Sequence, residues 1–514
     1  MALIAHLRSL KEPLEASLTL STTVTVVITI ISYVLVSCLN HKPYTPFPVL
    51  GQLHAFAGRP RQSILQWLLA ASRHFRGQAW RLELPLIGKG WFVNDPASLK
   101  LVLSTHHSSF GKGKFFEGRA RDLFGNGILI ATGDSWRAQR SAGQSMITPP
   151  TLEHFVETTL PRHLRVLLDP LDAAILSTDV VDLECSAMDY SLAVFGEIAF
   201  DVIEDNFVQA DWERMSASFS RPFTESSGRI ADRFGIPFYW IFERFLPYGR
   251  RLRDDLDRVH RFSRELLRES LEEIRQEELG NQDLKEGKGL LVRGLLASGF
   301  KMREAELADS CLNFLTAGRD TTGQAITWTL YLLLRHPSYF HDIYAEIDAL
   351  PPKTPHAELA SLLPVLEGAI SESLRLHPPI PLEILENISS RPVFLPHGEI
   401  VGPGEQVLWS AWVMARLPSF WGDDAEAFKP ERWMQMEKRP TAFEWPVFHA
   451  GPRSCLGRPL ARLELTFACV QLLRRYEFEM AWQGERAVGS TLTASMEGGL
   501  PVRVKRRGAG EIDR

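Results

Sequence analysis

The pattern of apolar and polar residues predicts a chain that is mostly helical. Long helical runs stand at Glu304–His336 and Leu366–Leu376. The stretch Arg250–Glu278 is densely charged and amphipathic, which is typical of a helix with one solvated face. Leu460–Leu473 is largely apolar and predicts a further helix. Trp80–Val93 instead alternates apolar and turn residues, so we expect a small hairpin there with its turn at Gly88 to Gly90.

An apolar run near the start of the chain predicts a membrane anchor. Residues 18–39 include no charged residue, and about 20 apolar residues in a helix can cross the hydrocarbon core of a bilayer. A cleaved secretory signal has a shorter apolar region, and a buried soluble helix keeps a polar face, so both alternatives fit less well. We therefore expect a tail at 1–17, a transmembrane anchor at 18–39 and a proline-rich hinge at 40–51.

The charges around this run predict its orientation. Basic residues are more frequent after it than before it, beginning with Lys42, so the main body is expected on the cytosolic side. The length of 514 residues alone suggests about three domains. No internal linker is long enough, or of low enough complexity, to divide the chain. We therefore expect 52–514 to form one domain.

Composition and charge exclude several classes of function. The net charge of −5 gives no reason to expect a nucleic-acid partner. The five cysteines are far apart, and none stands at a zinc-binding spacing, so neither a disulfide framework nor a zinc site is indicated. The 13 Trp and 29 Phe residues suit an apolar pocket and a large core equally well.

One cysteine stands in a tight loop that ends where a helix begins, within residues 448–457, which read Phe-His-Ala-Gly-Pro-Arg-Ser-Cys-Leu-Gly. Cys455 would gain there from the helix dipole and from the N–H groups of the loop, with Arg453 as a nearby cation. These conditions favour a thiolate, the form of cysteine that binds metals. A buried structural cysteine near a helix start is the alternative.

A second string indicates a helix that begins near residue 134. Asp134 or Ser135 is the expected cap. Trp136 and Arg140 are four residues apart, so they share one face of that helix. Taken alone, the pair fits a surface stack as well as a cofactor clamp.

A third string lies inside the long run Glu304–His336. The hydroxyl of Thr321 can turn toward the Ala317 carbonyl and locally loosen the helix. Asp320 places an acid next to this alcohol, which is the combination that proton delivery needs. Taken alone, the string also fits an ordinary helix surface.

A fourth string pairs Glu372 with Arg375 on one helix face. Apolar neighbours indicate that the pair is buried, and the guanidinium then needs a further partner. We expect a structural role for this pair.

Together these strings resemble the cytochrome P-450 superfamily. Phe448, Gly451, Arg453, Cys455 and Gly457 fill every fixed position of that family's haem-binding loop. The resemblance implies a mainly α fold, one P-450 domain with small peripheral β-sheets. It also implies haem b as the cofactor, with Cys455 as the axial ligand of the iron.

The resemblance also assigns roles to the other strings. It implies that Trp136, Arg140 and Arg453 bind haem propionates, that Asp320 and Thr321 relay protons to bound oxygen, and that Arg432 joins the pair Glu372–Arg375. One departure concerns Pro378–Asn387, where the family commonly has a basic residue for a propionate. No cation follows here until Arg391, so one propionate partner is missing.

The activity that the resemblance implies is that of a haem-thiolate monooxygenase in the endoplasmic-reticulum membrane. The electron donor would be NADPH-cytochrome P-450 reductase, with cytochrome b5 as an additional donor. A haem-thiolate isomerase or dehydratase, or a non-catalytic membrane haem-binding protein, are the alternatives. The pair Asp320–Thr321 speaks against both.

The substrate is suggested by resemblance at a finer level. Residues 110–130 and 497–504 resemble the fungal alkane and plant fatty-acid ω-hydroxylase branch, which favours an aliphatic chain; a fungal polyketide or other secondary-metabolite intermediate fits equally. The stretch Phe234–Pro247 is either core or a surface that rests on the membrane and roofs the substrate channel. Family position suggests six pocket residues: Phe115, Phe116, Leu312, Leu315, Ile380 and Met496.

Overall fold

The computed structural model describes residues 44–46, 51–200, 216–280, 289–351 and 354–508. The expected tail, the expected anchor and most of the expected hinge lie outside these ranges. Among the helices inside them, none is both long and apolar enough to cross a bilayer.

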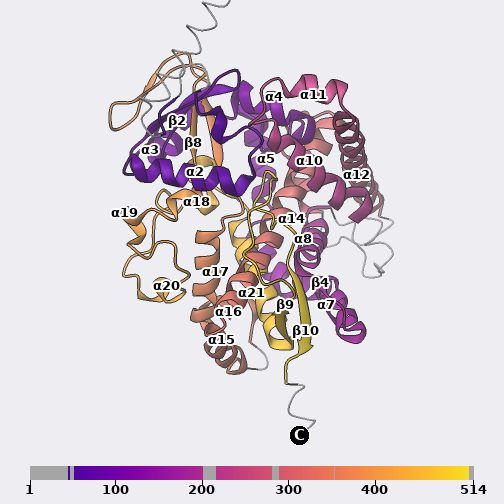
Figure 1. Cartoon of the computed structure of the whole chain (residues 1–514). Coiled ribbons are helices and arrows are strands. Elements are labelled where there is room, and N and C mark those ends of the chain that lie inside the picture. The colour runs from indigo at the N-terminus through magenta and orange to yellow at the C-terminus, as the bar shows by residue number, and fades with distance from the viewer. Residues whose placement is uncertain (1–43, 47–50, 201–215, 281–288, 352–353, 509–514) are drawn as a thin grey trace, which may run out of the picture.

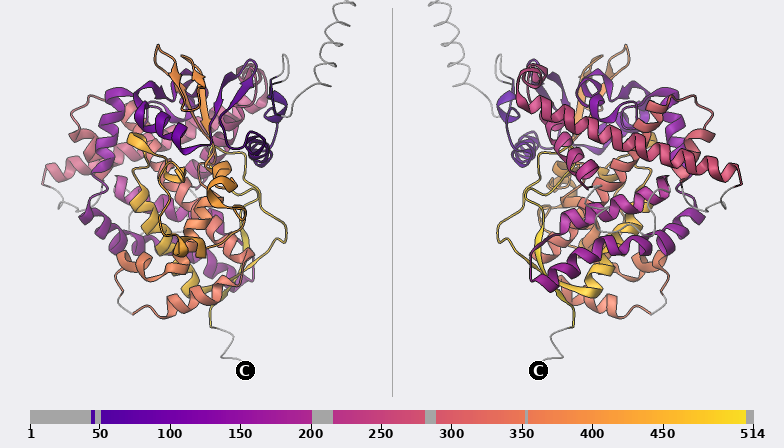
Figure 2. Two further views of the ribbon diagram at one scale, coloured as in Figure 1. Left: turned by 90° about the vertical axis from the view of Figure 1, so that its left-hand side faces the viewer. Right: turned by 90° about the vertical axis from the view of Figure 1, so that its right-hand side faces the viewer.

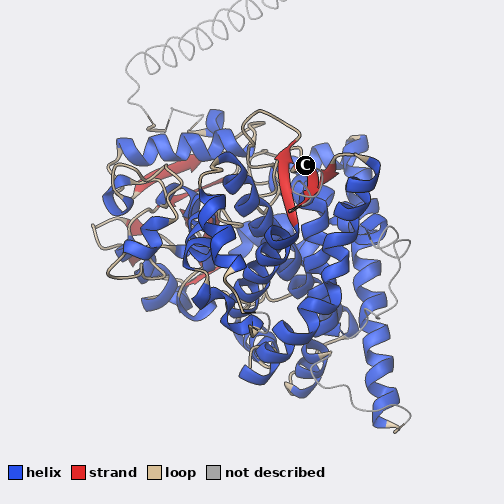
Figure 3. Cartoon of the chain, turned by 90° about the horizontal axis from the view of Figure 1, so that it is seen from below, coloured by secondary structure: helices blue, strands red, loops and turns tan. Residues whose placement is uncertain are grey.

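The described chain is mainly helical, as expected (Figure 3). The long helices are α2 (Arg61–His74), α7 (Leu160–Ser177), α8 (Leu183–Phe200), α12 (Pro247–Glu278), α14 (Glu304–Arg335), α17 (Pro364–Leu376) and α21 (Arg458–Arg475). The medium helices are α4 (Gly113–Phe124), α5 (Gly133–Gln144), α10 (Arg221–Asp232), α11 (Tyr239–Phe245), α13 (Leu290–Ala297) and α15 (Tyr339–Asp348). The short helices are α3 (Pro96–Lys100), α6 (Pro149–His154), α16 (Leu359–Leu362), α18 (Ala411–Met414), α19 (Pro418–Trp421) and α20 (Glu431–Gln435).

Helix α14 forms the centre of the molecule, with α8, α12, α17 and α21 packed around it (Figure 1). It begins with a capping box, in which the Arg303 N–H donates to Glu306 Oε2 at 2.9 Å. Nearly every side chain between Ala308 and Leu333 is buried. Helix α12 runs along the outside of the molecule and is visible as one long helix in Figure 2. Its charged face is solvated, as the sequence predicts.

The main sheet has five strands in the order β1-β2-β8-β5-β3. They are β1 (Trp80–Leu84), β2 (Gly88–Phe92), β3 (Phe110–Gly111), β5 (Glu383–Asn387) and β8 (Gln406–Trp409). The expected hairpin at 80–93 is confirmed, but the expected turn is wrong: residues 85–87 make it, and Gly88 and Gly90 pair in β2. A Cβ at Gly90 would stand 2.0 Å from the Gln406 carbonyl oxygen, so this glycine lets β8 approach in parallel.

Two smaller sheets complete the fold. One has the order β4-β10-β9, from β4 (Val181–Asp182), β9 (Tyr476–Met480) and β10 (Pro501–Arg506); the other pairs β6 (Val393–Phe394) with β7 (Ile400–Val401). The first sheet holds the end of the described chain beside the start of α8. As a result, the loop that joins β9 to β10 lies next to α8 and α14.

Candidate functional site

The cysteine loop lies between a short 3₁₀ turn, Gly451–Arg453, and the start of α21. The Cys455 N–H donates to the Phe448 carbonyl oxygen at 2.8 Å, which closes the loop. The sulfur accepts hydrogen bonds from the N–H groups of Gly457 and Arg458, at the N-terminal end of α21. The loop therefore directs free helix N–H groups at the sulfur, as the sequence predicts.

Gly451 is required by the backbone of this loop. Its φ is +69°, and an added Cβ would stand 1.9 Å from the Leu103 carbonyl oxygen. Only glycine combines this conformation with such a close approach. Gly457 has an ordinary φ of −76° at the N-cap of α21, and a Cβ there would meet nothing within 4 Å.

The protonation state of Cys455 differs from the expectation. Burial raises the pKa of the thiol above its ordinary value, whereas the N–H groups of Gly457 and Arg458 and the charge of Arg140 lower it by less. The free side chain is therefore a thiol at neutral pH. The donors around the sulfur would stabilise the thiolate once a metal ion displaces the proton, as metal binding to cysteine does.

The surroundings of Cys455 fit a flat ligand. Solvent reaches the side chain of Cys455, although protein atoms lie close to it on most sides. In the middle of α14, Ala317 is likewise exposed between buried neighbours. A Cβ on Gly143 of α5 would meet both Leu456, next to Cys455, and Phe314, on α14. The cysteine loop and α14 thus converge with small or exposed residues between them, which leaves room for a planar cofactor.

Two arginines and a tryptophan come together beside the cysteine loop. The guanidinium carbons of Arg140 and Arg453 lie 5.7 Å and 4.6 Å from the centre of the Trp136 ring. Arg140 Nη1 donates to the Ser454 carbonyl oxygen at 2.9 Å, and Arg453 Nη2 donates to that of Ala131 at 2.9 Å.

These two cations lack a carboxylate partner in the part of the chain that the structure describes. Burial lowers the pKa of Arg140, and burial together with Arg140 lowers that of Arg453. Two partly desolvated guanidinium groups side by side form a site for a carboxylate ligand. The expected cap of α5 is wrong: Thr132 is the N-cap, whereas Asp134 pairs with Arg137.

The acid and the alcohol on α14 have separate partners. Thr321 Oγ1 donates to the Ala317 carbonyl oxygen at 2.7 Å, as expected. Asp320 is buried, forms an ion pair with its neighbour Arg319 and accepts a hydrogen bond from Thr493. Burial raises the pKa of Asp320, and Arg319 opposes this shift. Sequence reasoning missed Arg319, whose only signal was a basic residue within an apolar helix.

A cation from another element lies near the gap noted at Pro378–Asn387. Lys112, at the start of α4, pairs with Glu383 of β5 at 2.8 Å, and both interact electrostatically with His449 of the cysteine loop. Burial acts to raise the pKa of Glu383, but Lys112 and then His449 outweigh it and hold the pKa low. Because residues 112 and 383 are far apart in sequence, no local pattern could have paired them.

The six expected pocket residues fall into three groups. Phe115 and Phe116 of α4 contact the ring of Phe234, at centroid distances of 5.8 Å and 5.4 Å. Leu312 and Leu315 are fully buried on α14. Ile380 is half-buried ahead of β5, and Met496 is buried in the loop between β9 and β10. Phe234 was not among the expected residues.

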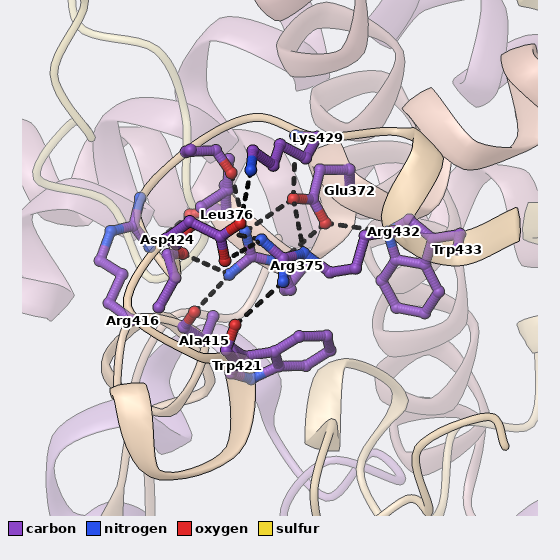
Figure 4. Close-up of polar contacts among 12 residues, drawn as sticks. Glu372, Arg375, Leu376, Ala415, Arg416, Trp421, Asp424, Lys429, Arg432 and Trp433 are labelled. Atoms are coloured by element: carbon purple, nitrogen blue, oxygen red, sulfur yellow. Dashed lines mark hydrogen bonds and ion pairs between the residues drawn. The ribbon is translucent and has the colours of Figure 1, made fainter. Parts of the chain in front are cut away.

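The expected charge network of Glu372, Arg375 and Arg432 is confirmed (Figure 4). Glu372 and Arg375 are fully buried and joined by two hydrogen bonds of 2.7 Å and 2.8 Å. Arg432 Nε lies 3.4 Å from Glu372 Oε1, and Trp433 Nε1 donates to Glu372 Oε2 at 2.8 Å. Carbonyl groups of the 415–427 segment accept from Arg375, so no donor of this guanidinium depends on solvent.

A family model described as Cytochrome P450 matches residues 42–491. The chain belongs to this family. Its members bind haem through a cysteine thiolate, and the chain is a P450 monooxygenase family member. Cys455, the two unpaired guanidinium groups and the space beside Ala317 fit that cofactor.

The chain is also similar to several plant P450s over most of its length. It is 26% identical to Cytochrome P450 94A1 of Vicia sativa over 474 residues, which cover 90% of each chain. It is 28% identical to Cytochrome P450 94B1 of Arabidopsis thaliana, covering 90% of this chain and 91% of the relative. It is 28% identical to Cytochrome P450 86B1 of the same plant, covering 95% and 90%. The expected resemblance to a plant branch of the family is thereby confirmed.

Proposed function

We propose that this P450 hydroxylates an aliphatic chain of a lipophilic substrate. The observation that carries the proposal is the pairing of a sulfur site at Cys455 with an acid and an alcohol on α14. The first holds the cofactor, and the second supplies protons on the side where oxygen binds. Bound haem would supply oxygen activation, since a thiolate ligand favours cleavage of the O–O bond.

The side chains around the cofactor would have distinct tasks. The N–H groups of Gly457 and Arg458 stabilise the sulfur charge, and Arg140 and Arg453 bind carboxylates at the cofactor edge. The Thr321 hydroxyl, held by the Ala317 carbonyl, would pass on a proton that is delivered through Asp320. Neither an isomerase nor a haem carrier needs this acid–alcohol pair, so it favours a monooxygenase over both alternatives.

An apolar wall supports a lipophilic substrate. Phe115, Phe116 and Phe234 form an aromatic cluster where α4 meets the end of α10. Flexible alkyl chains bind such surfaces through area and shape. The relatives of the 94 and 86 groups agree with an alkane-like or fatty-acid-like substrate, and a polyketide-like intermediate fits the same wall.

A basic groove supports a protein electron donor. It has a volume of about 630 Å³ next to the cysteine loop, and its lining includes Phe448, Arg439 and Arg458, together with Arg462 and its ion-pair partner Glu367. The Arg458 guanidinium carbon lies 5.3 Å from the centre of the Phe448 ring, so the groove reaches the residue that closes the cysteine loop. Cations there suit an acidic partner, for which we propose NADPH-cytochrome P450 reductase, assisted by cytochrome b5.

An exposed apolar surface supports attachment to the endoplasmic-reticulum membrane. Trp240 and Phe245 of α11 are 58% and 74% exposed, and Phe238, Phe242 and Leu246 beside them are also exposed. Contiguous exposed aromatic side chains mark interaction surfaces. This surface and the apolar run 18–39 would together hold the catalytic body on the cytosolic side.

Carbon monoxide binding and product analysis test the proposal. The reduced protein treated with carbon monoxide should show the red-shifted Soret band of thiolate-bound haem, and a Cys455→Ser variant should not. With reductase and NADPH, fatty acids or alkanes should yield hydroxylated products. A normal Soret band without NADPH-dependent oxidation of any lipophilic compound would favour an isomerase or a haem carrier.

A further inference from the structure

A cluster of buried and half-buried acids lies around Arg319 of α14. Arg319 forms an ion pair with Asp320 and interacts with Asp189 and Glu184 of α8. Asp182 adds a further negative charge beside Glu184. One arginine thus faces several carboxyl groups, so the cluster cannot hold all of them charged without a large cost.

Glu184 and Asp320 both accept hydrogen bonds from the loop that joins β9 to β10. Glu184 Oε1 accepts from the Met496 N–H at 2.8 Å, and Asp320 accepts from the Thr493 hydroxyl. Gln324 of α14 donates to the same Thr493 oxygen at 2.7 Å. Because Thr493 and Met496 are three residues apart in one loop, the two carboxyl groups lie in one buried polar region.

Burial favours the protonated form of the Glu184 carboxyl group. It is 8% exposed, and burial raises its pKa to about 8, with Asp182 and Asp320 adding to the shift and the Met496 N–H and Arg319 opposing it. At the same time it lies at the start of α8, one residue from Cys185, which is exposed. A buried, protonated carboxyl group next to a surface position can exchange its proton with water.

We propose that Glu184 is the proton reservoir for Asp320 and Thr321. When Asp320 gives its proton to Thr321, the proton of the Glu184 carboxyl group moves to the Asp320 carboxylate. Glu184 is left as a carboxylate and takes up a proton from water near Asp182. No bond other than O–H is formed or broken, and charge is conserved at each transfer. The inference rests on the proposed monooxygenase function.

Glu464 offers a matched control. This glutamate of α21 is also buried, burial raises its pKa to about 8, and Ser191 of α8 opposes that shift. It lies against Tyr190 and Ser191, and the groups that shift its pKa do not include Asp320 or Arg319. Glu464→Gln therefore removes a comparable buried acid that also lies against α8, without touching the cluster.

The experiment compares full-length Glu184→Gln, Glu464→Gln and wild type. The amide introduced by Glu184→Gln can still accept from the Met496 N–H, so substrate should bind to both variants as it does to wild type. Product formed per NADPH should fall several-fold in Glu184→Gln, with a larger solvent isotope effect on product formation, and should stay at the wild-type value in Glu464→Gln. Glu184→Asp should restore part of the loss.

Thermal unfolding against pH gives a readout independent of turnover. An acid whose folded pKa is raised makes the protein lose stability as pH rises from its unfolded pKa toward about 8. Both glutamine variants should therefore flatten the fall of Tm between about pH 5 and pH 8.

Equal product per NADPH in Glu184→Gln and wild type would overturn the inference, as would an equal loss in Glu464→Gln. An unchanged Tm profile in Glu184→Gln would show that Glu184 holds no extra proton. If wild type itself forms no oxidised product, it is the proposed function that fails.

Discussion

At the scale of single residues, the site combines a few groups whose properties depend on their neighbours. Cys455 is a thiol because burial outweighs its donors, and Asp320 is a shifted acid because Arg319 only partly compensates its burial. Thr321 is oriented by one carbonyl group. All three residues were recognised from sequence motifs, but the direction of the pKa shift of Cys455 and of Asp320 follows from packing.

The Thr321 hydroxyl can be tested by removing only that group. In Thr321→Ala we expect NADPH consumption to continue while hydroxylated product falls by about 10- to 100-fold, because the proton path is cut. Thr321→Ser keeps the hydroxyl and should retain most of the product. Product and NADPH are measured together by chromatography and absorbance; tightly coupled turnover in the alanine variant would contradict the role.

Substitution by alanine should destabilise the protein to different extents at the two glycines of the cysteine loop. Gly451→Ala should lower the free energy of unfolding by about 2–4 kcal/mol, since it adds a Cβ at positive φ against the Leu103 carbonyl. Gly457→Ala should cost less than about 1 kcal/mol, because its φ is ordinary and the space is open. Denaturant unfolding of both variants measures this difference, and similar losses would contradict it.

At the scale of elements, the site is held by contacts between segments that are distant in sequence. Helix α5 brings two cofactor-binding candidates to the cysteine loop, and α14 lies opposite that loop across Gly143. Behind the cysteine loop, α17 is fastened to the 415–433 segment by Arg375 and Glu372. The fold therefore fixes the site from three sides.

The buried ion pair Glu372–Arg375 of α17 should stabilise the protein more than an exposed ion pair does. Glu372→Gln removes the charge that faces Arg375 and should lower the free energy of unfolding by about 3–5 kcal/mol, because a buried guanidinium loses its counter-ion. Arg268→Ala breaks an exposed pair with Glu304 and should cost less than about 1 kcal/mol. Calorimetry of the two variants tests the ranking, and equal losses would show that burial does not decide it.

At the scale of the whole molecule, we propose that two surfaces serve partners. Helix α11, which carries the exposed apolar side chains, lies near α4 at the top of Figure 1, whereas the basic groove opens beside the cysteine loop. A membrane-facing surface and a donor-facing surface at different places let one molecule use both at once. The groove is formed by several elements and the apolar surface by one exposed helix, so the total charge and composition of the chain reveal neither surface.

Charge reversal in the groove tests the second surface. Arg439→Glu should raise the reductase concentration needed for half-maximal turnover several-fold, most strongly at low ionic strength, because electrostatic steering is lost. The carbon monoxide spectrum should stay unchanged. Arg268→Glu on α12 reverses an exposed charge outside the groove and should leave the reductase dependence as in wild type; an equal effect of both changes would contradict a specific groove.

The helical class, the long helix at 304–335, the hairpin at 80–93 and the cysteine loop could all be predicted from the amino-acid sequence. These features depend on local spacing: apolar periodicity, a helix start and glycines at fixed offsets. The same local reasoning placed the hairpin turn wrongly at Gly88 to Gly90 and the α5 cap wrongly at Asp134. Gly90 belongs to a strand because it pairs with another strand that is distant in sequence. At the start of α5, the backbone conformation makes Thr132 the N-cap.

Only the tertiary structure decided which distant residues meet. Lys112 with Glu383, Phe234 with Phe115, and Glu184 near Asp320 join residues more than a hundred positions apart, and no periodicity connects such positions. Burial, which sets the pKa of Cys455 and Glu184, likewise depends on everything packed around a group. Motifs could name the chemistry, whereas packing set its protonation and its partners.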